Sequence, residues 1–415
     1  MKMQNQNPEN IKDLKKEERK EKLIILALSL SLFLPAINNF INCFFQIGLG
    51  IDPGFLSELS YIAIVFIGVI AATFNFQKNI NMFFVALIIL GGIALSYFIY
   101  PKMRETIYEN PVDLIYNPIN KVAFFCIPLL LYTGQISDFR RAFFAMHKWA
   151  RINLVLGIVT YVYVVLVMKR ELQYMVFSYF MLTAICVCFE NFKENRKKID
   201  LLLMTLGTFA ILLCGARGAV LSALIYILMR SVFGKINVRK KHQGIWVMSM
   251  VILGLMILFL WNNIIYAIAD LCELLGVESR FITSLIDGAL MESSGRSSIS
   301  RAIWAGIKDN PLGFGFFGDR YAAGTYGFGR YSYAHNGFLE VIASFGVVIG
   351  PILILLFMIK LLKALKIKNT YYNMILWSLI PYGLFQLFFS SSAIENLGFY
   401  AICALMFSKK AGGKR

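Results

Sequence analysis

Runs of apolar residues recur along almost the whole chain, and no other feature constrains the fold as strongly. Each run holds about twenty residues, enough to cross a hydrocarbon core about 30 Å thick. Of the 415 residues, 58% are hydrophobic and only 16% are charged, which excludes an ordinary soluble domain. Backbone polar groups need partners in lipid, and the runs lack the alternating pattern of barrel strands. We therefore expect an all-α transmembrane helical bundle.

The apolar runs predict about twelve membrane helices. The expected spans are 23–45, 55–74, 80–100, 120–134, 152–168, 172–190, 199–214, 218–233, 244–266, 337–360, 371–390 and 394–408. Lysine and arginine gather in alternate connections and at both ends, so the positive-inside rule predicts that both termini face the cytoplasm.

The expected organisation has five parts. Cytoplasmic tails cover residues 1–22 and 409–415, and residues 23–266 and 335–408 hold the first nine and the last three helices. Residues 267–334 form one large, partly helical loop on the outer side. A loop of this length without structure of its own is unusual unless it is functional.

The net charge of +17 does not indicate a nucleic-acid partner, because the basic clusters lie between apolar spans and face the bilayer surface. The seven cysteines lie mostly in apolar runs, and Cys272 alone falls well inside a predicted polar loop. The histidines are scattered at 147, 242 and 335. We expect neither a disulfide framework nor a metal site, and no cofactor.

Two features of the outer loop favour ligand binding. The stretch SSGRSSISRAIWAGIKDNP predicts an amphipathic helix carrying Arg296, with Ser293 or Ser294 as its cap and Asn310 at its end. The following stretch, GDRYAAGTYGFGRYSY, is rich in glycine, tyrosine and arginine. Aromatic rings suit sugar faces, and arginine suits anions.

Three motifs occur in a fixed order on the expected outer side: a GARG turn, an SGR…W…NPLGFGF segment, and the re-entry run HNGFLE…FG…G. Together they resemble the O-antigen ligase and polysaccharide polymerase superfamily, over residues 211–230 and 293–350. The resemblance implies transfer of a glycan from undecaprenyl pyrophosphate to an acceptor hydroxyl. It also implies inversion at the anomeric carbon without a metal ion.

Three residues at the motif positions are candidate catalytic groups. Arg217, at the start of a helix, can make bidentate contacts to pyrophosphate, and Arg296 can share the neutralisation of this leaving group. His335 can deprotonate or position the acceptor hydroxyl. The alternatives are an interfacial arginine that reaches toward water, a solvated loop charge, and a histidine that caps or packs at a helix start.

Four further residues are candidate substrate-binding groups: Arg301, Arg320, Asn336 and Glu340. For Arg301 and for the neighbouring pair of Asp319 and Arg320, the residue types favour the alternative of solvated loop charges. Asn336 can instead cap a helix, and Glu340 falls in a first helical turn, where the helix dipole favours an acid.

The leading hypothesis is a polymerase for capsule, exopolysaccharide or O-antigen, with an undecaprenyl-pyrophosphate-linked glycan as donor and a glycan or lipid-linked acceptor. An O-antigen ligase acting on lipid A-core or another acceptor is the alternative within this class. A transporter or flippase for lipid-linked sugars should show an internal repeat, which we do not find. A structural subunit with envelope-assembly partners would leave the arginine and histidine positions unexplained.

Overall fold

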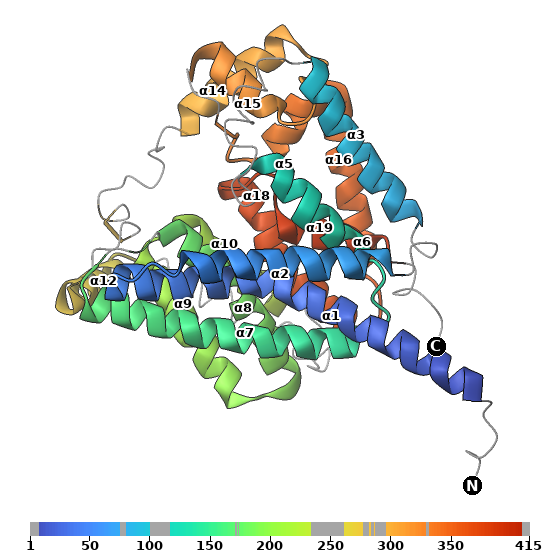
Figure 1. Cartoon of the computed structure of the whole chain (residues 1–415). Helices are drawn as coiled ribbons and strands as arrows, with labels where there is room; N and C mark the ends of the chain where they lie inside the picture. The colour runs from blue at the N-terminus through green and yellow to red at the C-terminus, as the bar shows by residue number, and fades with distance from the viewer. Residues whose placement is uncertain are drawn as a thin grey trace, which may run out of the picture. The chain divides into compact units, whose positions relative to one another are not determined.

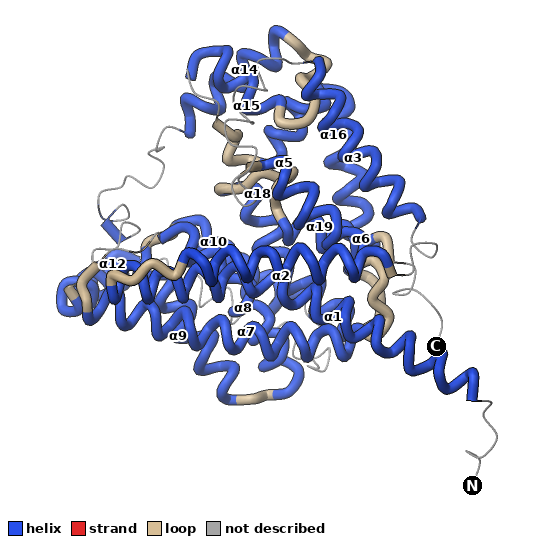
Figure 2. Tube along the Cα trace, viewed as in Figure 1, coloured by secondary structure: helices blue, strands red, loops and turns tan. Residues whose placement is uncertain are grey.

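The computed structural model describes residues 8–74, 80–99, 117–170, 172, 174–233, 261–276, 282–283, 286, 296–328 and 332–408. Every regular element within these ranges is a helix, and none is a strand (Figures 1 and 2). The expected all-α class is confirmed. The reason is physical: only helices and closed barrels satisfy every backbone polar group in lipid.

The longer helices are α1 (Pro8–Asn42), α2 (Gly54–Thr73), α3 (Ile80–Ile99), α7 (Phe139–Tyr161), α8 (Tyr174–Asn195), α9 (Lys198–Cys214), α10 (Arg217–Phe233), α12 (Trp261–Leu275), α14 (Arg296–Asp309), α16 (Gly337–Leu365), α17 (Thr370–Ile380) and α19 (Leu397–Met406). Shorter helices are α5 (Pro118–Lys121), α6 (Ile127–Thr133), α15 (Gly318–Ala323) and α18 (Gln386–Phe389). Several of these continue into π-helical turns, such as Cys43–Leu49 after α1.

Within the described residues, 6 helices are long and apolar enough to cross a membrane: Lys15–Leu49, Gly54–Thr73, Ile80–Ile99, Phe139–Val167, Met175–Asn195 and Gly337–Leu365. Shorter apolar helices are Pro118–Thr133, Gly218–Arg230 and Leu397–Met406. The chain is a multi-pass membrane protein. The full count of about twelve spans stays a prediction. Span 244–266 falls mostly outside the described residues, and span 371–390 is divided between α17, a π-helical turn at Pro381–Phe385 and α18.

The chain forms two compact units. Unit 1 comprises Met1–Pro35, Phe55–Trp149 and Ser294–Arg415, and unit 2 comprises Ala36–Gly54 and Ala150–Ser293. In unit 2, α8 and α9 pack side by side and α10 packs against both. Unit 2 also holds α12, a helix that carries the buried Cys272, so the expected loop 267–334 is helical at its start.

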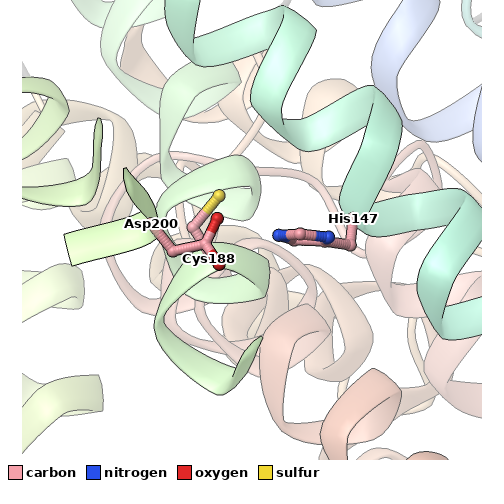
Figure 3. Close-up of side chains that lie close together, drawn as sticks. All are labelled: His147, Cys188 and Asp200. Atoms are coloured by element: carbon pink, nitrogen blue, oxygen red, sulfur yellow. The ribbon is translucent and has the colours of Figure 1, made fainter. Parts of the chain in front are cut away.

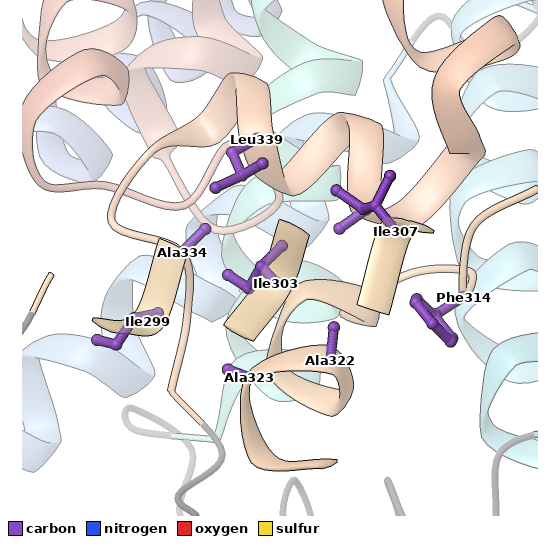
Figure 4. Close-up of a cluster of buried hydrophobic side chains, with 9 residues drawn as sticks. Ile299, Ile303, Ile307, Phe314, Ala322, Ala323, Ala334 and Leu339 are labelled. Atoms are coloured by element: carbon purple, nitrogen blue, oxygen red, sulfur yellow. The ribbon is translucent and has the colours of Figure 1, made fainter. Parts of the chain in front are cut away.

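Part of the expected outer loop has a core of its own in unit 1. Helices α14, α15 and the start of α16 pack together around one cluster of buried apolar side chains (Figure 4). Its members are Ile299, Ile303, Ile307, Phe314, Ala322, Ala323, Ala334, Leu339 and Ala343. The apolar residues of α14 recur at intervals of three and four, so one helix face supplies three of them. This core positions the candidate site.

Candidate active site

Arg296 is the first residue of α14. The predicted amphipathic helix is confirmed, and it ends as expected where the Asn310 N–H donates to the Gly306 carbonyl at 2.8 Å. The proposed caps, Ser293 and Ser294, lie outside the described residues. The Arg296 Nη1 donates to the carbonyl of Phe389 at 2.7 Å, which ties the guanidinium to the last residue of α18.

Arg301, one and a half turns further along α14, has a different environment. Its side chain is exposed, and its Nε lies 3.4 Å from the Ser297 carbonyl of the same helix. Among the described residues, Arg296 is in contact with another part of the unit, whereas the hydrogen bond given for Arg301 stays within α14.

The NPLGFGF segment and the HNGFLE…FG…G run, two of the sequence motifs, meet at a kink in α16. Gly346 interrupts the helix with φ of 78°, and Gly313 adopts φ of 89° opposite it. A Cβ on Gly313 would lie 2.5 Å from the Gly346 nitrogen, so a side chain there is sterically excluded. Phe314 and Gly315 donate their N–H groups to Ala343 and Ser344, both at 2.9 Å. The NPLGFGF segment therefore satisfies carbonyls that the kink in α16 releases.

His335 lies in a tight turn just before α16 and has a positive φ of 53°. On one side the Ala334 N–H donates to Asp319 Oδ2 at 2.8 Å. On the other, Asn336 Oδ1 caps α16 by accepting from the Phe338 and Leu339 N–H groups at 3.0 and 3.1 Å. The capping alternative for Asn336 is thus observed, and its role toward substrate stays a prediction.

The imidazole of His335 is held in its neutral form. Burial, and then the positive charge of Arg296, lower the pKa of His335 to about 4. The Tyr333 ring lies 4.0 Å from the imidazole, centroid to centroid. Nδ1 of His335 is buried and has no hydrogen-bond partner among the described residues. A neutral imidazole can accept a hydrogen bond from a hydroxyl group, whereas an imidazolium only donates.

Glu340 is 1% exposed in the first turn of α16, as the sequence pattern predicts for its position. Its Oε1 accepts from the Ser392 hydroxyl at 2.5 Å, and its Oε2 accepts from the Ala393 N–H. Both oxygens are engaged within the protein. Through these two hydrogen bonds, Glu340 fixes the segment 390–396, which lies between α18 and α19.

Arg320 has a partner, distant in the sequence, that the sequence motifs do not indicate. Its guanidinium pairs with Glu395, and the Lys121 Nζ lies 3.7 Å from the same carboxylate. The two cations together oppose the negative charge of the Glu395 carboxylate. Arg320 is 8% exposed and Asp319 is 0% exposed, so the solvated alternative for these two residues is wrong. Glu395 lies 75 positions after Arg320, and no local pattern signals the pair.

The GARG turn in unit 2 has the expected form. Gly215 ends α9 in the left-handed conformation, with φ of 81°, and its N–H donates to the Leu212 carbonyl at 3.1 Å. Helix α10 then begins at Arg217, and the Ala219 and Val220 N–H groups both donate to the Ala216 carbonyl. These two N–H groups are used within the chain, and the general preference of a helix start for anions applies to the N–H groups before them.

Unit 2 also contains two buried carboxylates with arginine partners. Glu190 accepts two hydrogen bonds from Arg230, one of them from Nη2 at 2.8 Å, and a third from the Tyr226 hydroxyl at 2.7 Å. Asp200 accepts from Arg151 Nε at 2.6 Å and from Asn191 Nδ2 at 2.5 Å.

Figure 3 shows Asp200 and Cys188 of unit 2; the third labelled residue, His147, belongs to unit 1. Both oxygens of Asp200 are hydrogen-bonded, and the ring of His147 is stacked on Phe143, with centroids 6.4 Å apart.

The apolar helices and the buried polar groups define a multi-pass membrane protein with a site built on irregular backbone. Residues 201–355 match the family model described as O-Antigen ligase. The match confirms the resemblance to the O-antigen ligase and polymerase superfamily, and indicates a glycan-processing enzyme with lipid-linked glycan substrates. Neither the curated proteins nor the solved structures contain a match. The matched region includes Arg217, Arg296 and His335 but ends before Glu395.

Proposed function

We propose that the protein polymerises undecaprenyl-pyrophosphate-linked repeat units on the outer face of the cytoplasmic membrane. It acts as an inverting, metal-independent glycosyltransferase. The observation that carries the proposal is that burial and the positive charge of Arg296 keep the His335 imidazole neutral in unit 1. An apolar cavity, lined by Gly337 and Phe338, lies directly after this residue in the chain.

The reaction needs one group at the attacking hydroxyl and a second group at the departing pyrophosphate. The acceptor hydroxyl oxygen attacks the anomeric carbon from the face opposite the pyrophosphate, and the glycosidic C–O bond breaks with its electron pair passing to the pyrophosphate. The hydroxyl proton passes to the neutral imidazole of His335. Arg296 opposes the charge that develops on the leaving group, since fixed cations in a partly desolvated site stabilise such charge better than water does.

The cavity supports a lipid-linked donor. It has a volume of about 320 Å³ and contains no charged residue. Gly337 and Phe338 line it directly after the His335 turn, and Ala393 and Ile394 line it directly before Glu395. An amphipathic substrate with a polar phosphate and an apolar chain needs a polar surface next to an apolar one, and this part of unit 1 offers both.

Arg217 enters the proposal from the sequence motif and from its place at the start of α10. A helix start and a guanidinium both favour phosphate oxygens, so we assign Arg217 to the pyrophosphate. Arg301, Arg320, Asn336 and Glu340 were candidates for substrate binding. The contacts above favour internal roles for the last three.

The family model carries the description of a ligase, so the second candidate function is transfer to lipid A-core or another acceptor. The two activities differ only in the acceptor. Purified protein given a synthetic lipid-linked donor should lengthen the lipid-linked glycan if it is a polymerase. It should modify an added lipid A-core acceptor if it is a ligase.

The test of the proposal is His335→Ala in this assay with excess chelator. We expect a loss of about 10²–10⁴-fold in glycan transfer, the usual contribution of a general acid–base group. His335→Gln retains a hydrogen-bonding side chain but cannot take the proton. An equal loss in the glutamine variant supports proton transfer, and partial activity supports positioning. Parental activity of His335→Ala, or activity that returns only with added Mg²⁺ or Mn²⁺, contradicts the proposal.

A further inference from the structure

The backbone of His335 is itself informative. A non-glycine residue in the left-handed region costs about 1–2 kcal/mol, and such a conformation persists only where the surroundings enforce it. His335 has φ of 53°, so neighbouring contacts must hold the turn in place. Those contacts decide where the imidazole points.

The C-terminal side of the turn is held by a local device. Asn336 caps α16 through its own side chain, and this interaction spans only two and three residues. Such a cap forms wherever the helix starts and carries no information about the preceding backbone. It leaves the N-terminal side of the turn undetermined.

The N-terminal side is held from a distance. Ala334 is 3% exposed, and its N–H donates to Asp319, 15 residues earlier in the chain. Its methyl group belongs to the apolar cluster between α14, α15 and α16 (Figure 4). Loss of the carboxylate would leave a buried N–H without its partner, and the turn could relax to return that group to water.

Asp319 is rigidly placed for this role. It lies on α15, where Gly318 packs closely against the Ala343 carbonyl of α16 and Arg320 pairs with Glu395. The carboxylate is 0% exposed, which leaves no room for direct contact with a sugar.

We propose that Asp319 is the positioning residue for His335: its carboxylate fixes the Ala334 N–H and thereby sets the strained turn that presents the imidazole to the acceptor hydroxyl. The inference rests on the proposed function and extends it to a residue outside the reacting atoms. Asp319 acts on the rate only through His335.

A double-mutant cycle tests this dependence. Asp319→Ala should lower kcat by about 10–100-fold with little change in KM for the lipid-linked donor, because small displacements of a catalytic group have effects of this size. Asp319→Asn should restore most of the rate, since its amide oxygen can accept the same hydrogen bond. In a His335→Ala background, measured over long incubations, Asp319→Ala should cause no further loss.

The matched control is Asp309→Ala. Asp309 lies on α14 in the same unit, and its carboxylate accepts only a surface hydrogen bond from Tyr326 among the interactions described. It should keep the parental kcat. If Asp319→Ala does not accumulate in folded form, Asp319→Ser replaces it in the cycle, since the shorter serine side chain does not reach the Ala334 N–H.

Three results overturn the inference while leaving the proposed function intact: parental kcat in Asp319→Ala, an equal further loss in the His335→Ala background, or no rescue by Asp319→Asn. Full activity of His335→Ala overturns the proposed function as well. The two failures are therefore distinguishable in one set of variants.

Discussion

The two units use buried carboxylates in different ways. In unit 2, Glu190 and Asp200 each face an arginine, so an ion pair joins one helix to another. In unit 1, Asp319 and Glu340 accept hydrogen bonds from the N–H groups of Ala334 and Ala393, which lie in non-helical segments. The same type of side chain fastens helices in one unit and irregular backbone in the other.

Because of this difference, substitutions of these residues should affect stability and activity to different extents in the two units. Removing one member of a buried ion pair leaves an uncompensated charge, which is costly wherever it occurs. Removing a carboxylate that holds a loop leaves one or two unsatisfied groups and releases a segment of chain. We therefore expect substitutions that disrupt the buried ion pairs of unit 2 to act mainly on folding, and substitutions of the two loop-holding carboxylates of unit 1 to act mainly on turnover.

The largest effect should come from Arg230→Ala. It leaves Glu190, which is 1% exposed, without its cation, and breaking such a pair costs about 3–5 kcal/mol. Thermal unfolding of the purified protein should show a clear fall in Tm, with turnover per folded molecule unchanged. The double variant Glu190→Leu with Arg230→Leu should recover much of the loss. An unchanged Tm in the single variant would show that this pair does not hold the helices together.

A smaller effect on stability, but a larger one on activity, should follow from Glu340→Ala. The Ser392 hydroxyl and the Ala393 N–H lose their acceptor, at a cost of about 1–3 kcal/mol for the unsatisfied groups. The segment 390–396 would be released together with the Phe389 carbonyl that holds Arg296. Turnover per folded molecule should fall about tenfold, as expected for a displaced catalytic group.

Glu340→Gln is the matched variant, because it retains one acceptor oxygen. It should lie between the parent and the alanine variant in both measurements. If Glu340→Ala lowers Tm as much as Arg230→Ala while turnover stays normal, the proposed division between the units is wrong.

The smallest effect should be on pH dependence. The pKa of folded His335 is about 4, below the ordinary value of 6.5. The neutral form therefore persists from pH 8 to about pH 5, and the rate attributed to it should fall only as pH approaches 4. Between pH 6.5 and 4 the unfolded chain binds the proton more readily than the folded protein. His335 accordingly lowers stability as pH falls through this window.

A pH–rate profile with a parallel unfolding series checks both trends. His335→Gln should lack the contribution of this group to each. An inflection near pH 6.5 in the parental enzyme that disappears in the glutamine variant would mean that the imidazole is solvated during turnover.

Local patterns predicted several parts of the site. The cap at Asn336, the beginning of α16 at Gly337 and the turn at Gly215 all follow from residues within a few positions of each other. The helix carrying Arg296 follows from its apolar spacing. Each of these features depends on interactions within one or two helical turns, which a sequence displays directly.

The burial of Asp319 and Arg320 could not be predicted in this way. Charged residues in a glycine-rich segment are usually solvated, and that expectation holds until a distant partner is known. Here the partner is Glu395, which lies beyond the recognised motifs. Glu340 is similar, since its contacts at Ser392 and Ala393 are 52 and 53 positions away.

The amino-acid sequence by itself determined that the chain is a helical membrane protein, because apolar runs in lipid leave the backbone few alternatives. It also indicated where α10 and α16 begin, because the signals that start a helix lie within a few positions of its first residue. Only the tertiary structure decided which carboxylate holds which segment, and that the His335 imidazole is neutral in a strained turn. Hydrogen bonds and desolvation depend on distances between residues far apart in the chain, and folding alone sets those distances.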